Sequence, residues 1–171
     1  MLPDLRLPVE LSTRVGDVAV RRATASDLPA LIALLSDDPI SAARGDRAAD
    51  GDAAAYQEAL TGVLDAPLND LLVVDAADGT VVGTLQLTVI PGMARRGATR
   101  LLVEAVRVSS RVRSSGIGGA VMRWVMHEAA SDTGATLVQL TSDAARVDAH
   151  RFYTRLGFAD SHIGFKYTVG R

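Results

Sequence analysis

The sequence predicts a mixed α/β fold, in which helices flank a central twisted sheet of mixed, mostly antiparallel strands. One observation is the pair Asp78-Gly79 between two strand-like segments, since Asp-Gly tolerates the positive φ of a tight hairpin turn. A second is the order strand, glycine-rich turn, helix, strand across residues 101–140, which is typical of a parallel crossover. The hairpin makes its strands antiparallel and the crossover makes one pair parallel, so a mixed sheet follows.

The first half of the chain shows one strand followed by two helices. Residues 18–22 alternate apolar and polar side chains, as a half-buried strand does. Thr24 and Asp27 form a helix start signal, a hydroxyl cap with an acid three residues on. The apolar stripe that follows has helical spacing: Leu28, Leu31, Ile32 and Leu35. Residues 37–52 are polar and acid-rich and are predicted as a loop, and a second helix is predicted for residues 53–64, before Pro67.

The second half is richer in strands. The predicted strands are residues 71–74, 81–90, 101–108, 137–140 and 163–167, with one more short strand expected at Phe158. Arg95, Arg96 and Gly97 are expected in a loop. A helix over residues 116–130 is predicted from the stripe Ile117, Val121, Trp124 and Val125, and Gly134 marks its end. The stripe of the last helix is Ala149, Phe152, Tyr153 and Leu156, and Gly157 stops it.

Composition and charge narrow the classes of protein. The 171 residues are 48% hydrophobic and 22% charged, which suits one globular domain, expected over residues 17–171 behind an N-terminal arm of residues 1–16 outside the core. A net charge of −2 gives no global attraction to nucleic acid or an anionic membrane, so neither is expected as a partner. The absence of cysteine excludes disulfides, thiolate metal sites and a cysteine nucleophile.

Targeting and metal signals are also missing from the sequence. No segment has the apolar run of a signal peptide or the length of a membrane span, so a cytoplasmic location is expected. His127, His150 and His162 have no metal-ligand spacing, and no metal site is expected. His150 is interpreted as a surface residue, His127 is expected on the polar side of the glycine helix and His162 in a turn. None is expected to have a catalytic role, and Trp124 is interpreted as a core residue.

The most informative segment is the polar, glycine-rich turn between the strand 101–108 and the helix that follows it. The first turn of a helix leaves backbone N–H groups without partners, and the helix dipole adds positive potential there. Because Gly116, Gly118 and Gly119 have no Cβ, an anion can come close to the backbone, and Arg113 adds a forked cation. The turn therefore suits a phosphate or pyrophosphate. The alternative is that the glycines only permit a tight turn and close helix packing.

Two common nucleotide motifs do not fit this turn. A P-loop needs Lys and then Ser or Thr after its second glycine, but Gly119 and Ala120 follow Gly118. A dinucleotide fingerprint needs a third glycine where this chain has Val121. The pattern that fits is R-x-x-G-x-G, formed by Arg113, Gly116 and Gly118.

With this motif the chain resembles the GNAT superfamily of acyl-CoA-dependent N-acetyltransferases. Residues 103–108 look like the family's central strand, and residues 149–158, with the sequence AHRFYTRLGF, look like its penultimate helix and closing turn. The order of elements agrees from about Val18 to the C-terminus, so a GNAT-like fold is expected. One departure is Ser114, where the family often has glycine.

The resemblance implies how acetyl-CoA binds as a co-substrate. The pyrophosphate would lie on the amides of the glycine turn, and the pantetheine arm would pair like an added strand with the central strand. The residues implied in cofactor binding are Val106, Arg107, Val108, Arg113, Ser114, Ser115, Gly116, Ile117, Gly118 and Gly119.

Two side chains are candidate catalytic residues for direct attack of an amine on the thioester. Glu104 is expected on one strand face with Leu102, Val106 and Val108, where apolar neighbours would make it a stronger base. The alternative is a partly buried glutamate paired with an arginine. Tyr153 matches the family's tyrosine that protonates the leaving CoA thiolate, and its alternative is a core tyrosine.

The acceptor is less constrained. The aspartates of the first loop would attract a cationic amine or simply be solvated: Asp37, Asp38, Asp46, Asp50 and Asp52. The basic cluster Arg95, Arg96 and Arg100 would instead favour an acceptor with a carboxylate, or only solubility. A small-molecule primary amine is the preferred acceptor. A protein amine, or a CoA-binding module without catalysis, is the alternative, and the oligomeric state is open, with a homodimer as one option.

Overall fold

A computed structural model describes residues 2–38, 40, 42 and 51–170. The chain divides into two compact units, Met1–Leu140 and Thr141–Arg171, which are described separately below. The predicted single domain over residues 17–171 stays a prediction.

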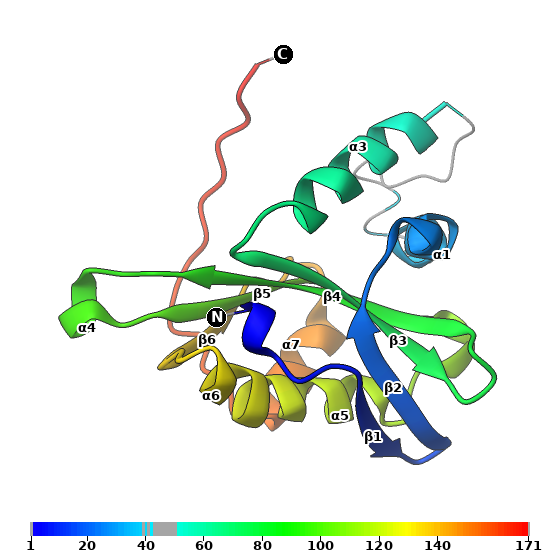
Figure 1. Cartoon of the computed structure of the whole chain (residues 1–171). Coiled ribbons are helices and arrows are strands. Elements are labelled where there is room, and N and C mark those ends of the chain that lie inside the picture. Colours follow the sequence, from blue (N-terminus) through cyan, green and yellow to red (C-terminus); the bar gives the residue numbers. More distant parts are fainter. Residues whose placement is uncertain (1, 39, 41, 43–50, 171) are drawn as a thin grey trace. The chain divides into compact units, whose positions relative to one another are not determined.

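The first unit contains a six-stranded sheet whose spatial order follows the chain (Figure 1). Its strands are β1 (Val9–Thr13), β2 (Gly16–Arg22), β3 (Asn69–Ala76), β4 (Val81–Ile90), β5 (Arg100–Val108) and β6 (Leu137–Leu140). Neighbours from β1 to β5 are antiparallel, and β5 and β6 are parallel. The β3–β4 hairpin turns at Gly79, whose φ is +80°, and the Ala76 N–H donates to the Thr80 carbonyl across 2.9 Å. The predicted mixed, mostly antiparallel sheet is confirmed.

The N-terminal segment is part of this sheet, and the expectation of an arm outside the core is wrong for the described residues. β1 pairs with β2 through a register that sets Val9 opposite Val20. A 3₁₀ turn, η1 (Leu2–Asp4), precedes it, and Leu2 and Leu5 are only 1% and 3% exposed. The Arg22 Nη2 donates to the Leu2 carbonyl across 2.7 Å, which attaches the first residues to β2. Every residue of β1 remains at least partly exposed, so its alternation is weak in the sequence.

Two helices cover one face of the sheet, α1 (Leu28–Ser36) and α3 (Ala53–Leu64) (Figure 1). A 3₁₀ turn, η2 (Ala25–Asp27), leads into α1, and the Thr24 N–H donates to the Asp27 carboxylate across 2.7 Å. Leu31 and Leu60 from the helices pack with Val73 of the sheet in one buried cluster. Both predicted helices are confirmed. Residues 39, 41 and 43–50 of the predicted loop lie outside the described residues.

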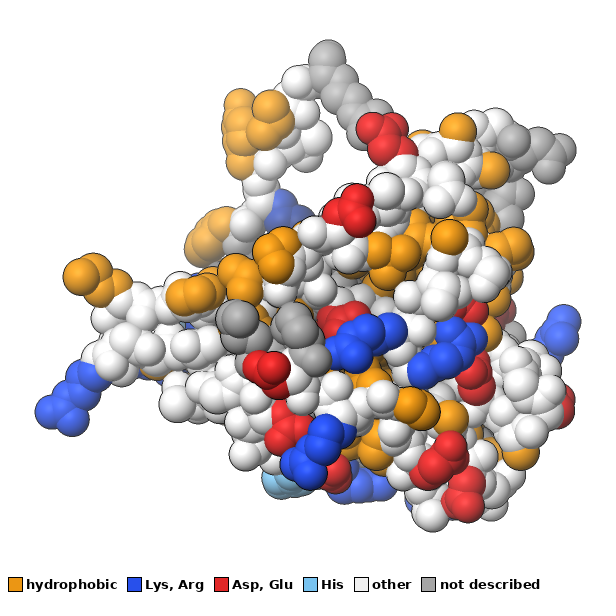
Figure 2. Space-filling view, in the orientation of Figure 1, with side chains coloured by type: hydrophobic (Ala, Val, Ile, Leu, Met, Phe, Trp, Pro, Cys, Tyr) orange, Lys and Arg blue, Asp and Glu red, His pale blue; other side chains and the backbone are white. Residues whose placement is uncertain are grey.

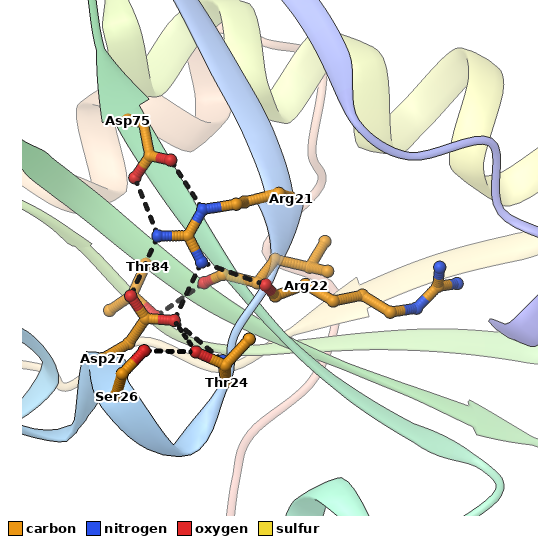
Figure 3. Close-up of polar contacts among 8 residues, drawn as sticks. Arg21, Arg22, Thr24, Ser26, Asp27, Asp75 and Thr84 are labelled. Atoms are coloured by element: carbon orange, nitrogen blue, oxygen red, sulfur yellow. Dashed lines mark hydrogen bonds and ion pairs between the residues drawn. The ribbon is translucent and has the colours of Figure 1, made fainter. Parts of the chain in front are cut away.

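Figure 3 shows a closed polar cluster where β2, β3 and the start of α1 meet. The Arg21 guanidinium donates to Asp27 through Nη1 and Nη2, across 2.8 and 2.9 Å, and to Asp75 through Nε across 2.6 Å. The hydrogen bonds from Arg21 lower the pKa of Asp27 to about 2, against the smaller opposing effect of burial. One cation therefore joins three elements through two carboxylates.

Within the first unit, a long helical segment lies on the other face of the sheet (Figure 1). It consists of α5 (Ile117–Trp124), a π-helical turn (Val125–Ala129) and α6 (Ala130–Asp132). The predicted stripe is buried, including Trp124, which is a core residue as expected. The segment is followed by Gly134, whose φ is +68°. The predicted helix over residues 116–130 is confirmed, with the π turn as an added feature.

A short helical segment lies where a loop was expected, α4 (Ala94–Gly97). Arg95 and Arg96 within it have φ of 54° and 62°, in the left-handed region. The segment is thus a tight connection between β4 and β5.

The second unit contains α7 (Val147–Arg155), which confirms the predicted last helix, and Gly157 follows with a φ of +97°. Residues 158–170 form no helix or strand, so the predictions of a final strand at residues 163–167 and of a short strand at Phe158 are wrong. The alternating Ile163, Phe165 and Tyr167 are each more than 80% exposed. Alternation describes a strand only where a partner strand accepts its hydrogen bonds, and within the described part of the chain these residues have none.

Acidic and basic side chains are interspersed over the face seen in Figure 2, which shows no large patch of one sign. Among the described residues, no helix is both long and apolar enough to cross a membrane.

Candidate functional site

The glycine-rich turn leads from the end of β5 to the start of α5, as the sequence predicts. A 3₁₀ turn, η3 (Ser110–Val112), follows β5, and Gly116 is the N-cap of α5 with a φ of +94°. Ser114 has a φ of +64° in the left-handed region that favours glycine. This explains why a glycine is compatible with the position where the chain departs from the family pattern.

Backbone donors are free at the start of α5. The helical ladder begins with the Ala120 N–H, which donates to the Gly116 carbonyl across 2.9 Å. Across the described residues, the N–H groups of Ile117, Gly118 and Gly119 have no acceptor. Ser114 is exposed, and Gly116, Gly118 and Gly119 are half-buried, so the turn is open to solvent. An anion can therefore reach three backbone donors at the positive end of the helix.

Ser115 is a buried polar residue of the turn. It is 8% exposed, and its Oγ is a buried polar atom without a hydrogen-bond partner in the described structure. Its carbonyl accepts a hydrogen bond from the Arg14 N–H across 3.1 Å. The turn thus holds one unsatisfied hydroxyl, which is unusual for a buried side chain.

Arg113 holds the turn through its side chain. Its Nη2 donates to the Asp37 carbonyl across 3.1 Å, and its Nε donates to the Val108 carbonyl across 3.4 Å. Two of the guanidinium donors of Arg113 are therefore used by the protein backbone. Arg113 therefore connects the end of β5 with the end of α1.

Asp37 is a residue of this site that the sequence analysis placed only in an acidic loop. Its carboxylate accepts from the Ser110 N–H across 2.6 Å and from the Ser110 Oγ across 2.9 Å. The backbone hydrogen bond from Ser110 is the largest cause of a pKa held below the usual range of an aspartate. The sequence near Asp37 contains no pattern that indicates a contact with Ser110, which is 73 positions away.

The strand β5 has one open edge. Its parallel register with β6 covers only Arg100 to Val103, which pairs with Leu140. From Glu104 to Val108, β5 pairs with β4 on one side, and no strand of the described residues pairs with it on the other. Extended amides can pair with such an edge, and Val106 and Val108 lie on it, although their carbonyls accept hydrogen bonds from Arg107 Nη1 and Arg113 Nε. Their role in binding pantetheine stays a prediction.

The predicted strand face of Glu104 is wrong with respect to Val106 and Val108, because β5 contains a bulge. Ala105 has a φ of +49°, and the register between β4 and β5 shifts there. Glu104 lies opposite Gln86 and Arg107 lies opposite Thr84. Opposite residues of paired strands share a face, so Glu104 shares its face with Arg107 and not with Val106 and Val108. Glu104 is exposed, so the expectation of an acid among apolar neighbours is also wrong.

Tyr153 lies on α7 in the second unit. Its ring makes edge contacts with Phe152 and Phe158, with centroids 5.1 and 5.8 Å apart. Its role as an acid stays a prediction. The three histidines His127, His150 and His162 are exposed, as expected for His150.

Several described residues of the two charged clusters considered for the acceptor interact within the protein. In the acidic loop, Asp37 is bonded to Ser110 and Asp38 is buried, while Asp46 and Asp50 lie outside the described residues. In the basic cluster, the Arg100 Nη1 donates to the Gln139 side chain across 3.1 Å. The described residues contain no group of three or more side chains arranged to hold a metal ion.

The sheet, the glycine turn and the open β5 edge define an acyltransferase fold. The chain matches the model of the acetyltransferase (GNAT) family over residues 30–158, and it belongs to this family. Members of the family use acetyl-CoA as a co-substrate.

Solved structures and one curated relative are similar to this chain. A transcriptional regulator from Bacillus halodurans C-125 has a solved structure with a TM-score of 0.82 and 36% identity, covering 89% of this chain and 99% of that one. The glucosamine-6-phosphate N-acetyltransferase from Arabidopsis thaliana shares the fold, with a TM-score of 0.70 and 17% identity over 90% of this chain and 99% of its own. An aminoalkylphosphonate N-acetyltransferase from Salmonella typhimurium is 36% identical over 63 residues, which span 37% of this chain and only 40% of that protein.

Proposed function

We propose that the protein transfers an acetyl group from acetyl-CoA to the primary amine of a small molecule. The observation that supports this most is that two open backbone features lie close together in the sequence. One is the edge of β5 from Glu104 to Val108, which no strand of the described residues pairs, and the other is the set of free amides from Ile117 to Gly119. A thioester carrier has an extended arm whose amides can pair with the strand edge. It also has a diphosphate that can accept hydrogen bonds from the free amides.

The residues present fit CoA. The diphosphate would accept hydrogen bonds from the amides of the glycine turn, where the helix dipole favours negative charge. The pantetheine amides would pair with the β5 edge at Val106 and Val108, beside Arg107. When bound, acetyl-CoA supplies the thioester whose carbonyl the amine attacks.

Glu104 is the proposed general base. An alkylammonium must lose a proton before its nitrogen can attack, and the exposed Glu104 carboxylate at the start of the open edge can accept that proton directly or through water. The new C–N bond forms as the C–S bond breaks. Glu104→Gln is expected to lower kcat/KM by about 10²-fold, the low end for general-base catalysis. Unchanged kcat/KM across the pH range would exclude this role.

Tyr153 is the proposed acid, which gives its phenolic proton to the departing CoA thiolate. This role rests on the family resemblance of the α7 sequence. Tyr153→Phe should lower kcat much more than it weakens acetyl-CoA binding. An equal kcat in the variant would refute the assignment.

The acceptor class is supported by the match to the aminoalkylphosphonate N-acetyltransferase, whose acceptor is a small amine. The test supplies acetyl-CoA and a panel of amines, and follows free thiol. The panel contains aminoalkylphosphonates, amino sugars, amino acids and peptides with a free N-terminus or lysine. Faster turnover of small amines than of peptides is expected, and the reverse would favour a protein acceptor.

A second candidate is a CoA-binding regulatory module without catalysis. The 36% identity with a transcriptional regulator favours this alternative. Binding of CoA without turnover of any amine in the panel would support it. A homodimer and a cytoplasmic location stay predictions.

A further inference from the structure

The connection between β1 and β2 brings a second arginine to the glycine turn. The Arg14 N–H donates to the Ser115 carbonyl across 3.1 Å, which fixes this backbone position beside the turn. A Cβ added to Gly116 would lie 3.5 Å from the Arg14 Cγ and 3.9 Å from its Cδ. The aliphatic part of the Arg14 side chain therefore lies alongside the N-cap residue of α5.

The Arg14 guanidinium is exposed and makes no hydrogen bond or ion pair with any described residue. Arg113, in contrast, donates to two backbone carbonyls. Of these two arginines beside the turn, Arg14 is thus the one whose guanidinium N–H donors are all available to a ligand. The buried, unpartnered Ser115 Oγ is an independent sign that the turn has polar groups for a ligand to satisfy.

We propose that Arg14 binds a phosphate of CoA and is a cofactor-binding residue contributed by the N-terminal hairpin. This inference rests on the proposed function. A guanidinium forms paired, charge-assisted hydrogen bonds with phosphate oxygens, whereas a backbone amide gives one. The free amides of α5 would hold the diphosphate from one direction, and Arg14 would neutralise its charge from the side of the β1–β2 connection.

The backbone hydrogen bond of Arg14 agrees with this role. Its backbone N–H donates to the Ser115 carbonyl, so the backbone of Arg14 is positioned beside the turn before any ligand arrives. Preorganisation reduces the entropy lost when a long side chain binds. The N-terminal segment then has a binding function in addition to its place in the sheet.

The experiment measures CoA binding to the full chain by titration calorimetry at low and moderate salt. Arg14→Gln removes the charge and keeps much of the side-chain length, Arg14→Lys keeps the charge, and Arg95→Gln is the matched control at an exposed arginine on α4. Arg14→Gln is expected to weaken CoA binding about tenfold, as expected for loss of a charge-assisted hydrogen bond, and to reduce its salt dependence. Arg14→Lys should restore part of the affinity, and Arg95→Gln should bind as the unchanged protein does.

Pantetheine, which carries no phosphate, is the second probe. Its affinity should be the same for Arg14→Gln and the unchanged protein, because Arg14 would contact only the phosphates. Equal CoA affinity in Arg14→Gln, or a matching loss of pantetheine affinity, would overturn the inference while leaving the proposed function intact. If the unchanged protein binds no CoA, both the proposed function and this inference fail.

Discussion

The chain holds two polar regions of opposite character. In the cluster around Arg21, the cation donates to Asp27 and Asp75, and its partners lie within the protein (Figure 3). At the glycine turn, three backbone amides and the Arg14 guanidinium have no acceptor among the described residues. Satisfied donors join secondary structure elements, whereas open donors at a helix N-terminus are available to a ligand. The two regions should therefore respond differently to substitution.

The largest expected effect is on stability, at the closed cluster. Arg21→Ala leaves two carboxylates without their cation and should lower the free energy of unfolding by about 3 kcal/mol. Urea unfolding followed by circular dichroism measures this loss. CoA affinity of the folded variant should not change, and a loss of affinity without a loss of stability would remove the distinction between the regions.

The same cluster should make unfolding sensitive to acid. The pKa of Asp27 is lowered from 3.8 to about 2 in the folded chain, so Asp27 stabilises the fold at pH values above 4. This contribution, roughly 2 kcal/mol, should disappear as the pH falls from 4 to 2. Comparing unfolding of the unchanged protein and Asp27→Asn across this range isolates it. A parallel pH dependence in the two proteins would contradict the assignment.

At the open turn, Gly116→Ala tests the backbone conformation. Alanine at a φ of +94° should cost about 1–2 kcal/mol, and the resulting shift of the turn should weaken CoA binding about tenfold. Thermal unfolding and calorimetry measure the two effects. Gly62→Ala on α3 is the matched control, because Gly62 has no positive φ and open space for a Cβ. Equal behaviour of the two variants would show that the turn needs no glycine.

The smallest expected effect is at the link between α1 and the turn. Asp37→Asn keeps an oxygen that can accept a hydrogen bond from Ser110, but the bond loses its charge and becomes weaker. The link between α1 and the turn is then less firm, and CoA affinity should fall about threefold. Asp65→Asn is the control, since Asp65 is the C-cap of α3 as Asp37 is of α1. Calorimetry that finds the same affinity in both variants would place Asp37 outside the cofactor site.

Much of the fold could be predicted because its signals are local. The helix Ala53–Leu64 and the strand Val81–Ile90 have the predicted bounds, and the hairpin turns at Gly79. Periodicity, capping and turn chemistry depend on residues close together in the chain. The same holds for the glycine turn, where the strand, the motif and the helix are consecutive.

The errors arise where distant partners decide the structure. β1 was missed because it is a half-exposed strand whose place is set by β2, and the predicted strand at residues 163–167 has no described partner. The bulge at Ala105 changes which residues share a face with Glu104, and no residue pattern marks it. Asp37 and Arg14 reach the site only through contacts across 73 and 101 positions of the sequence, Asp37 with Ser110 and Arg14 with Ser115.

The most direct test follows backbone amide signals by nuclear magnetic resonance while CoA is added to the full chain. The largest shifts are predicted for Ile117, Gly118 and Gly119, with smaller shifts along β5 from Glu104 to Val108. The Arg21 Nε–H signal should stay unchanged, because its partners are internal. Unchanged signals at the start of α5, at CoA concentrations that saturate related enzymes, would contradict the account.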